Sequence, residues 1–149
     1  MTAEARRGVR DWLRAAEALV LLALFRVCLA VVPVHKIMKT VTRERVGAGG
    51  SASGAGEHEA SERDVAIAMQ ARWAIEAVHR HSPVEFVCFP QTLAGYVMLR
   101  RRRVASTMVY GVARSPQGEL TAHTWLLVGN RTVVGGEGSG AFAEVERWR

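Results

Sequence analysis

The stretch Phe86–Val104, FVCFPQTLAGYVMLRRRRV, carries the strongest structural signal in the sequence. Its residues Cys88–Arg102 predict a helix, because Pro90 suits a first helical turn and apolar side chains recur behind it. The arginine run Arg100–Arg103 closes this helix, where positive charge suits the negative end of the helix dipole. The pattern places Cys88, one of two cysteines in the chain, at the start of a helix.

Three strand-like segments follow this helix. Ser106–Arg114 and Leu120–Val128 are rich in β-forming residues, and the turn signal Ser115–Gly118 lies between them. The pair Gly129–Asn130 is a hairpin signal before a third strand, Arg131–Val134. The pattern predicts an α+β fold in which the helix that carries the cysteine packs on an antiparallel β-meander.

The composition upstream divides the chain. A capping box that begins at Ser61 starts another predicted helix over Glu62–His79. Residues 47–60, GAGGSASGAGEHEA, hold no large apolar side chain and predict a flexible linker. We therefore expect an N-terminal helical arm over 1–46, the linker over 47–60 and the core over 61–149.

An apolar segment runs through the arm from Leu13 to Val34. Glu17 and Arg26 interrupt it, which disfavours a membrane-spanning helix. The helical spacing instead predicts a buried or groove-packed helix that ends near Pro33, with a membrane-surface role as the alternative. The face that we expect to be buried comprises Trp12, Leu13, Ala16, Leu19, Val20 and Ala23.

Length and composition restrict the function classes. The 149 residues are 49% hydrophobic and 23% charged, which excludes a collagen-like or fully disordered chain. Two cysteines are too few for a disulfide framework, so we expect a reduced, cytoplasmic setting. The net charge of +6 suits an acidic peptide, an anionic membrane or nucleic acid. We expect no nucleic-acid partner, because neither aromatic–basic interleaving nor zinc-ligand spacing occurs.

Cys88 is the best candidate for chemistry. Backbone N–H groups at a helix start favour a thiolate, and a nucleophilic cysteine also needs a base within reach. His123 is the best candidate base, because it lies on a predicted core strand, whereas Cys28 is expected to pack inside the apolar helix. These residues alone also fit a structural cysteine and a structural histidine. We expect no metal site and no cofactor.

Three blocks of sequence occur in order behind the apolar N-terminal helix. The first is the helix that holds Cys88, Pro90, Leu93, Ala94 and Leu99 before the arginine run. The second is Tyr110–Arg114, and the third combines Ala122–Leu126 with Gly129–Gly136. These blocks resemble the patterns C-L-x-R-A-L-A-x-x-x-L-L-R-R-R-G-I, ϕ-G-V-R and H-A-W-x-E-x-x-G-R-x-ϕ of the lasso peptide biosynthesis B2 proteins, which are transglutaminase-like.

The resemblance implies a papain- or transglutaminase-like core and a cysteine peptidase. Such an enzyme removes the leader from a ribosomally made lasso precursor peptide. By this resemblance, Cys88 attacks the scissile carbonyl, His123 acts as the base, and the Cys88 N–H helps to hold the oxyanion. The alternatives are a non-catalytic partner-binding protein on the same fold and an amide-forming acyl transferase.

The resemblance also implies partners. They are the precursor peptide, a lasso cyclase of the asparagine-synthetase-like kind, and a separate leader-recognition (PqqD-like) protein. A separate protein is expected because residues 1–60 do not have the pattern of a fused recognition domain. The apolar face of the N-terminal helix is a candidate docking surface for it.

The sequence departs from the family pattern at the third catalytic position, an Asp on the strand after the histidine. A turn at 129–130 would place His123 opposite Gly136, so Glu137 is the nearest carboxylate and our candidate orienter of the imidazole. The alternative is that Glu137 is an exposed residue of a glycine-rich loop, and that a backbone carbonyl or a water molecule orients the imidazole.

Two further departures are Gln91, where the family has Arg, and Arg103, where it has Gly. The candidate contacts to an acidic leader or a partner are Arg100, Arg101, Arg102, Arg103 and Trp125. A solvated helix end is the alternative role for the arginines.

Overall fold

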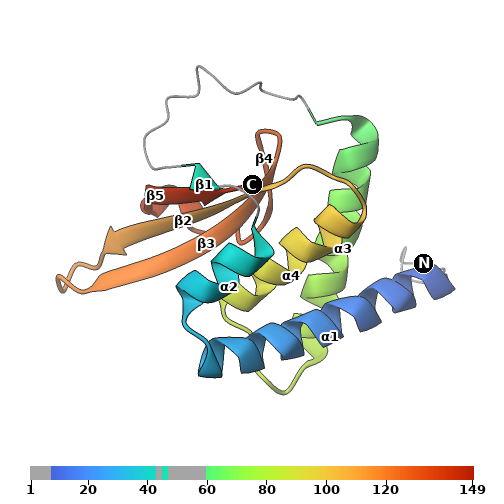
Figure 1. The fold of residues 1–149 in the computed structure, drawn as a ribbon, viewed down its shortest axis with the longest axis horizontal. Coiled ribbons are helices and arrows are strands. Elements are labelled where there is room, and N and C mark those ends of the chain that lie inside the picture. The colour runs from blue at the N-terminus through green and yellow to red at the C-terminus, as the bar shows by residue number, and fades with distance from the viewer. Residues whose placement is uncertain (1–7, 43–44, 47–59) are drawn as a thin grey trace.

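The computed structural model describes residues 8–42, 45–46 and 60–149. Within these ranges the chain forms four α-helices, one 3₁₀ helix and a five-stranded antiparallel sheet (Figure 1). The helices are α1 (Val9–Val31), α2 (Val34–Val41), α3 (Glu62–His81), α4 (Cys88–Arg101) and η1 (Ser139–Ala141). The strands are β1 (Arg45–Val46), β2 (Thr107–Arg114), β3 (Leu120–Val128), β4 (Arg131–Val134) and β5 (Ala143–Trp148). The predicted α+β class is confirmed.

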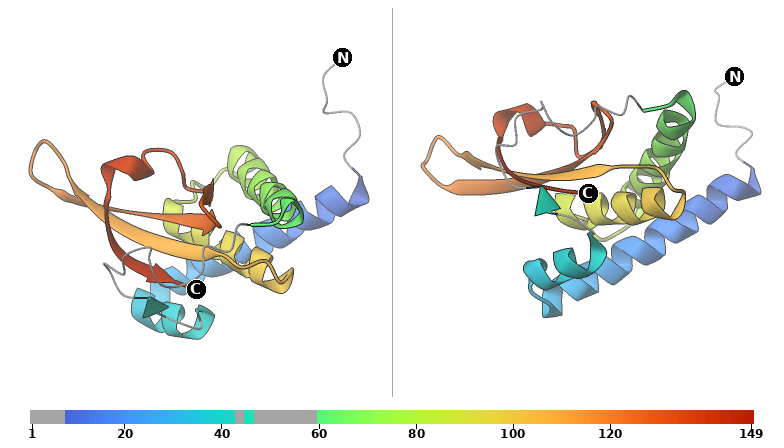
Figure 2. Two further views of the ribbon diagram at one scale, coloured as in Figure 1. Left: turned by 90° about the horizontal axis from the view of Figure 1, so that it is seen from above. Right: turned by 45° about the horizontal axis from the view of Figure 1, so that its top comes forward.

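The sheet is more than the predicted meander. Strands β2, β3 and β4 are consecutive neighbours as expected, but β5 pairs with the free edge of β2 and gives the order β1-β5-β2-β3-β4. After η1, the final strand β5 lies between β2 and β1, on the side of the sheet away from β4 (Figures 1 and 2). Strand β5 was not predicted, because its sequence AEVERW is mostly polar and lacks a long apolar run.

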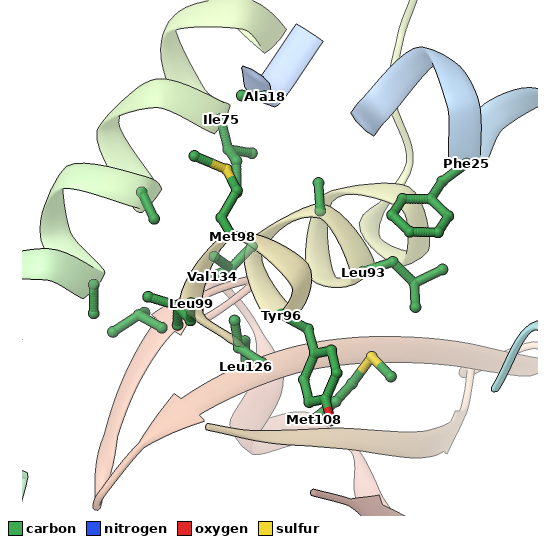
Figure 3. Close-up of a cluster of buried hydrophobic side chains, with 14 of the residues drawn as sticks. Ala18, Phe25, Ile75, Leu93, Tyr96, Met98, Leu99, Met108, Leu126 and Val134 are labelled. Carbon is green, nitrogen blue, oxygen red and sulfur yellow. The ribbon is translucent and has the colours of Figure 1, made fainter. Parts of the chain in front are cut away.

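Helix α4 lies directly against the sheet. A Cβ atom at Gly95 would stand 3.0 Å from the Leu126 side chain and 3.1 Å from that of Val134, so the missing side chain permits this close approach. Leu93, Met98 and Leu99 are fully buried around it (Figure 3). The helix that bears the cysteine is therefore held rigidly on β3 and β4.

A Schellman motif ends α4. The Val104 N–H bonds the Leu99 carbonyl and the Arg103 N–H bonds the Arg100 carbonyl, at 3.0 Å each. Arg103 accordingly has a left-handed φ of +59°, the conformation that favours glycine. Glycine, the residue of the pattern that this segment resembles, would take this conformation without strain.

The arginines before this cap bind other parts of the chain. Arg102 forms an ion pair with Glu17 of α1 at 2.6 Å, and Arg101 reaches the same carboxylate at 3.0 Å. The Arg100 guanidinium donates to the Val41 carbonyl at the end of α2. The C-terminal end of α4 is thus tied to both N-terminal helices.

Helix α1 buries a different face from the one expected. Its buried residues are Ala18, Leu22 and Phe25, which pack towards α3 and α4 (Figures 2 and 3). All six residues of the expected face are exposed, Trp12 to 72%. The error arose because α1 carries two apolar faces, and periodicity along one helix does not distinguish which of them meets the core.

The N-terminal helices share the core of the rest of the chain. One cluster of buried side chains runs from α1 and α2 through α3 and α4 to the sheet. The helical segment set apart as an arm therefore packs on the predicted core, and most of the predicted linker lies outside the described residues. Among the helices of the described ranges, none is long and apolar enough to cross a bilayer.

Helix α3 begins as its capping box predicts. The Ser61 hydroxyl accepts a hydrogen bond from the Asp64 N–H at 3.1 Å. The helix runs two residues beyond the expected end, to His81, and buries Ala71, Ala74 and Ile75 against its neighbours. Small side chains on this face allow close packing of the helical layer.

Candidate active site

Cys88 is the first residue of α4 and is half-buried. The preceding residue, Val87, is the N-cap and supplies no side-chain acceptor to the helix start. The first N–H groups of a helix have no intrahelical partners, so backbone donors lie beside the Cys88 thiol. The Gln91 amide donates to the Phe86 carbonyl at 2.5 Å and fastens the loop that leads into the helix.

A pair of buried threonines joins this helical turn to β3. The Thr92 hydroxyl lies 2.9 Å from the Cys88 carbonyl and 3.2 Å from both the Thr124 carbonyl and the Thr124 hydroxyl. Both side chains are fully buried, at 0% and 1% exposure. A single hydroxyl proton serves one carbonyl at a time, while the Thr124 hydroxyl donates to Thr92. The bridge fixes the Cys88 turn beside the strand residue that follows His123.

Sequence reasoning missed this threonine bridge. A threonine that bonds the carbonyl four residues earlier is common in helices and gives no tertiary signal. The one available clue was position, since Thr92 stands four residues after the cysteine and Thr124 stands next to the histidine.

His123 lies on β3 and is half-buried. Its Nε2 atom is 2.8 Å from the Gly135 carbonyl oxygen. A carbonyl oxygen can only accept, so Nε2 carries the proton in this hydrogen bond. In the neutral imidazole the other nitrogen, Nδ1, is then the one that can accept a proton.

Gly135 is shaped for this contact. It has a left-handed φ of +69°. A Cβ atom there would lie 2.5 Å from the Thr124 carbonyl oxygen, closer than such atoms approach. Glycine is therefore required both by the backbone angle and by the space, and the position of its carbonyl depends on both.

Aromatic rings hold the imidazole from the sides. The Trp125 ring stacks on it with centroids 6.0 Å apart, and the Phe142 ring lies at 5.1 Å. Gly111 on β2 makes room for the indole, because a Cβ there would be 2.8 Å from its ring. Trp125 is buried, so it supports His123 and offers little surface to a peptide.

Glu137 does not fill the orienting position expected for it. Its side chain is exposed, and the hydrogen bond on the imidazole comes from the Gly135 carbonyl. A bulge at Leu126–Leu127 changes the register with β4, and the ladder ends at Val134. The expectation assumed that pairing continues past Val134, but the chain turns at Gly135, which has a positive φ, so residue 137 is not held opposite His123. A backbone carbonyl, one of the two alternatives, occupies the site.

Cys88 and His123 approach the same part of β3 from different sides. Thr124 and Leu126 face α4, so His123 and Trp125 at alternate positions rise from the other face. The imidazole contacts the Gly135 carbonyl at the edge of β3, beyond the point where pairing with β4 ends. No hydrogen bond joins the thiol and the imidazole of these two described residues.

The arginine run lies at the opposite end of α4. The Arg100 guanidinium donates to the Val41 carbonyl, and those of Arg101 and Arg102 pair with the Glu17 carboxylate. These contacts favour a structural use of the three side chains. Arg103 is exposed in the helix-ending motif.

Comparison with known families identifies the superfamily of the chain. The model of the transglutaminase-like superfamily matches residues 28–147, from the last turn of α1 to the last strand. The chain belongs to this superfamily, whose members are typically cysteine hydrolases and acyl transferases. No curated protein and no solved structure matched the chain.

Proposed function

We propose that this protein is a cysteine peptidase that removes the leader from a ribosomally made lasso precursor peptide. The observation that supports the proposal is the threonine bridge, which joins the Cys88 turn of α4 to Thr124, the residue that follows His123 on β3. Superfamily membership supports Cys–His chemistry on an amide bond. The ordered sequence blocks of the lasso family support the choice of substrate.

The proposed reaction has two steps. The Cys88 sulfur attacks the scissile carbonyl carbon, a thioester forms, and the amine of the core peptide leaves with a proton from His123. Water then attacks the thioester, gives its proton to His123 and releases the leader with a free carboxylate. The N–H groups at the start of α4 stabilise the oxyanion in both steps.

The tautomer of His123 supports its role as the base. Because Nε2 donates to Gly135, Nδ1 is left to take the proton of the thiol. The Gly135 carbonyl fixes the tautomer of the imidazole, as the carboxylate of a catalytic triad does, but carries no negative charge. The proposed reaction requires the imidazole and the thiol to lie within hydrogen-bond reach in the substrate complex.

The proposal includes the setting of the reaction. The enzyme works in the cytoplasm on a precursor that a separate leader-recognition protein presents. The amine that it frees is the nucleophile that a lasso cyclase then joins to a side-chain carboxylate. Hydrolysis here must therefore precede ring closure.

Cleavage of precursor peptides tests the proposal. A panel of lasso precursors, each with its own leader-recognition protein, is incubated with the full chain and followed by mass spectrometry. We expect separate leader and core fragments, with heavy oxygen from labelled water in the leader carboxylate. Cys88→Ala and His123→Ala should each abolish cleavage, whereas Cys28→Ala should retain it.

Other outcomes overturn the proposal in distinct ways. Cleavage that survives Cys88→Ala excludes the nucleophile. A product joined to an added amine without labelled oxygen identifies an acyl transferase. If no precursor is cleaved but the recognition protein binds, the protein is a non-catalytic binding partner.

Thiol modification gives a substrate-free test of the same site. Cys28 and Cys88 are both half-buried, so Cys28 is an internal control for simple access. We expect iodoacetamide to modify Cys88 faster than Cys28, because the proposal assigns the nucleophile to Cys88 and a packing role to Cys28. Equal rates at the two cysteines would argue against an activated nucleophile.

A further inference from the structure

The outward side of α1 is apolar along its whole length. At 3.6 residues per turn, these side chains occupy an arc of about 140° opposite the buried residues Ala18, Leu22 and Phe25. All are exposed, with the large ones between 50% and 77%. This outer face of α1 comprises Val9, Trp12, Leu13, Ala16, Leu19, Val20, Ala23, Leu24, Val27, Ala30 and Val31.

The rest of the chain is poorly suited to cover the outer face of α1. Helices α3 and α4 pack on the side of α1 that faces away from this outer face (Figure 2). The segments 1–7, 43–44 and 47–59 contain no large apolar side chain apart from Met1. An exposed apolar surface of this extent is uncommon on a monomer and marks a docking site.

Positive charges border this face. At the same helical spacing, Arg10 lies at one border of the arc and Arg26 at the other, and both are exposed. Lys36 and Lys39 add two exposed charges on the adjoining α2. A binding partner must therefore bury apolar side chains and carry negative charge opposite these basic residues.

The acidic residues of α1 do not offset these border charges. Asp11 forms an ion pair with Arg14 at 2.8 Å. Glu17 is engaged by two arginines of α4, at 2.6 Å and 3.0 Å. The border of the outer face is therefore positive.

We propose that the outer face of α1 docks on an anionic lipid surface, with the helix lying in the plane of the bilayer interface. Apolar side chains on one side and basic residues at the borders are the pattern of interfacial helices. Trp12 lies near one end of the face, and tryptophan favours the interface. Because the other side of α1 is fixed to α3 and α4, the helix lies on the bilayer and does not cross it.

A second copy of the chain fits this face less well. Another helix covers a narrower seam than about 140°, which would leave residues near the borders, such as Leu19 and Leu24, in water. Pairing two copies would also bring two positively bordered helices together without acidic partners. A lipid surface is deformable, covers the whole width and supplies the negative charge.

Vesicle binding tests the proposal with the full chain. We expect co-sedimentation with vesicles of phosphatidylcholine and phosphatidylglycerol, and weaker binding to phosphatidylcholine alone. Val20→Glu and Val27→Glu should each lower binding at least tenfold, because each places a charge in the centre of the face. Leu120→Glu is the matched control, since Leu120 is 70% exposed on β3, and it should bind as the unchanged chain does.

Removing one positive charge distinguishes electrostatic attraction to anionic lipid from nonspecific hydrophobic adsorption. Arg26→Gln should lower binding to the anionic vesicles about fivefold, the usual contribution of one basic residue, and leave neutral vesicles unaffected. Far-UV circular dichroism checks that every variant folds. Cys88→Ala should bind vesicles normally, so that docking and peptide cleavage fail separately.

Three results would overturn the proposal. They are no binding to anionic vesicles, equal binding by Val20→Glu and Leu120→Glu, or a dimer in light scattering that Val20→Glu dissociates while vesicles stay unbound. The last would assign the face to a second copy. Saturable binding of a leader-recognition protein, lost in Val20→Glu, with no vesicle binding would assign it to that protein.

Discussion

The two ends of α4 use their polar groups differently. At the N-terminal end, Cys88 is half-buried, lies beside unpaired backbone donors and has no hydrogen bond to His123. At the C-terminal end, Arg101 and Arg102 are paired with Glu17, and a Schellman motif closes the helix. The first end leaves the Cys88 thiol without a bond to His123, whereas the charges at the second end hold helices together. Changes near the first should alter rates, and changes at the second should alter stability.

The largest effect is expected from Gly135→Ala, on the side of the molecule that holds the N-terminal end of α4. The new Cβ would collide with the Thr124 carbonyl, so the Gly135 carbonyl would leave the His123 imidazole. We expect kcat for leader cleavage to fall about 100-fold with little change in KM, as small displacements of catalytic groups cost this much. Gly138→Ala is the matched control, because Gly138 also has positive φ but open space around its Cβ position. Equal kinetics for the two variants would contradict this role of Gly135.

Thr92→Val should come next. It keeps the shape of the side chain but removes the hydroxyl that joins Cys88 to Thr124. We expect the free energy of unfolding to fall by about 1–3 kcal/mol, because buried groups lose a partner. We also expect kcat to fall about tenfold through misplacement of the thiol.

A matched threonine controls for the loss of a helix hydroxyl. Thr40 on α2 makes the same bond to the carbonyl four residues earlier, but it is exposed and its partner Lys36 lies on the same helix. Thr40→Val should leave both unfolding and cleavage nearly unchanged. If Thr92→Val loses stability but retains full kcat, the bridge is structural and does not position the thiol.

Glu17→Gln tests the other end of α4. The Glu17 side chain is 16% exposed and pairs with two arginines. The stability lost with it should therefore lie between that of an exposed ion pair and that of a buried one. We expect about 1–2 kcal/mol less stability in urea unfolding, with kcat unchanged. Glu144→Gln, which breaks an exposed pair with Arg147, should cost less than about 0.5 kcal/mol. A kinetic defect in Glu17→Gln would show that the two ends are coupled.

Arg103→Gly should stabilise the protein. Arg103 has a φ of +59°, where a side chain is strained and glycine is not. We expect a gain of about 1 kcal/mol in the free energy of unfolding, with no change in cleavage rate. A loss of stability would mean that the exposed guanidinium makes a contact worth more than the strain.

The smallest effect is expected from Glu137→Gln. The side chain is exposed, and the Gly135 carbonyl already holds Nε2 of the imidazole. Cleavage kinetics should match the unchanged chain. A large fall in kcat would restore Glu137 as the orienter in the substrate complex.

Much of the local structure could be predicted. The start of α4 at Cys88, the strand that holds His123 and the cap at Ser61 all follow from short-range patterns. Strand β5 could not be predicted, because its partner is β2 and its own residues carry little apolar signal. The roles of Cys88 and His123 in catalysis stay predictions, supported by superfamily membership.

The amino-acid pattern was enough to place a cysteine at a helix start and a histidine on a following strand, because capping, periodicity and turn signals act within a few residues. Tertiary contacts decided the rest. Because β4 pairing ends at Val134 and the chain turns at Gly135, a backbone carbonyl and not the Glu137 carboxylate contacts His123. Glu17 pairs with Arg101 and Arg102. Packing on α3 and α4 chose which apolar face of α1 is buried. These choices depend on residues distant in sequence, whose register and packing no local pattern specifies.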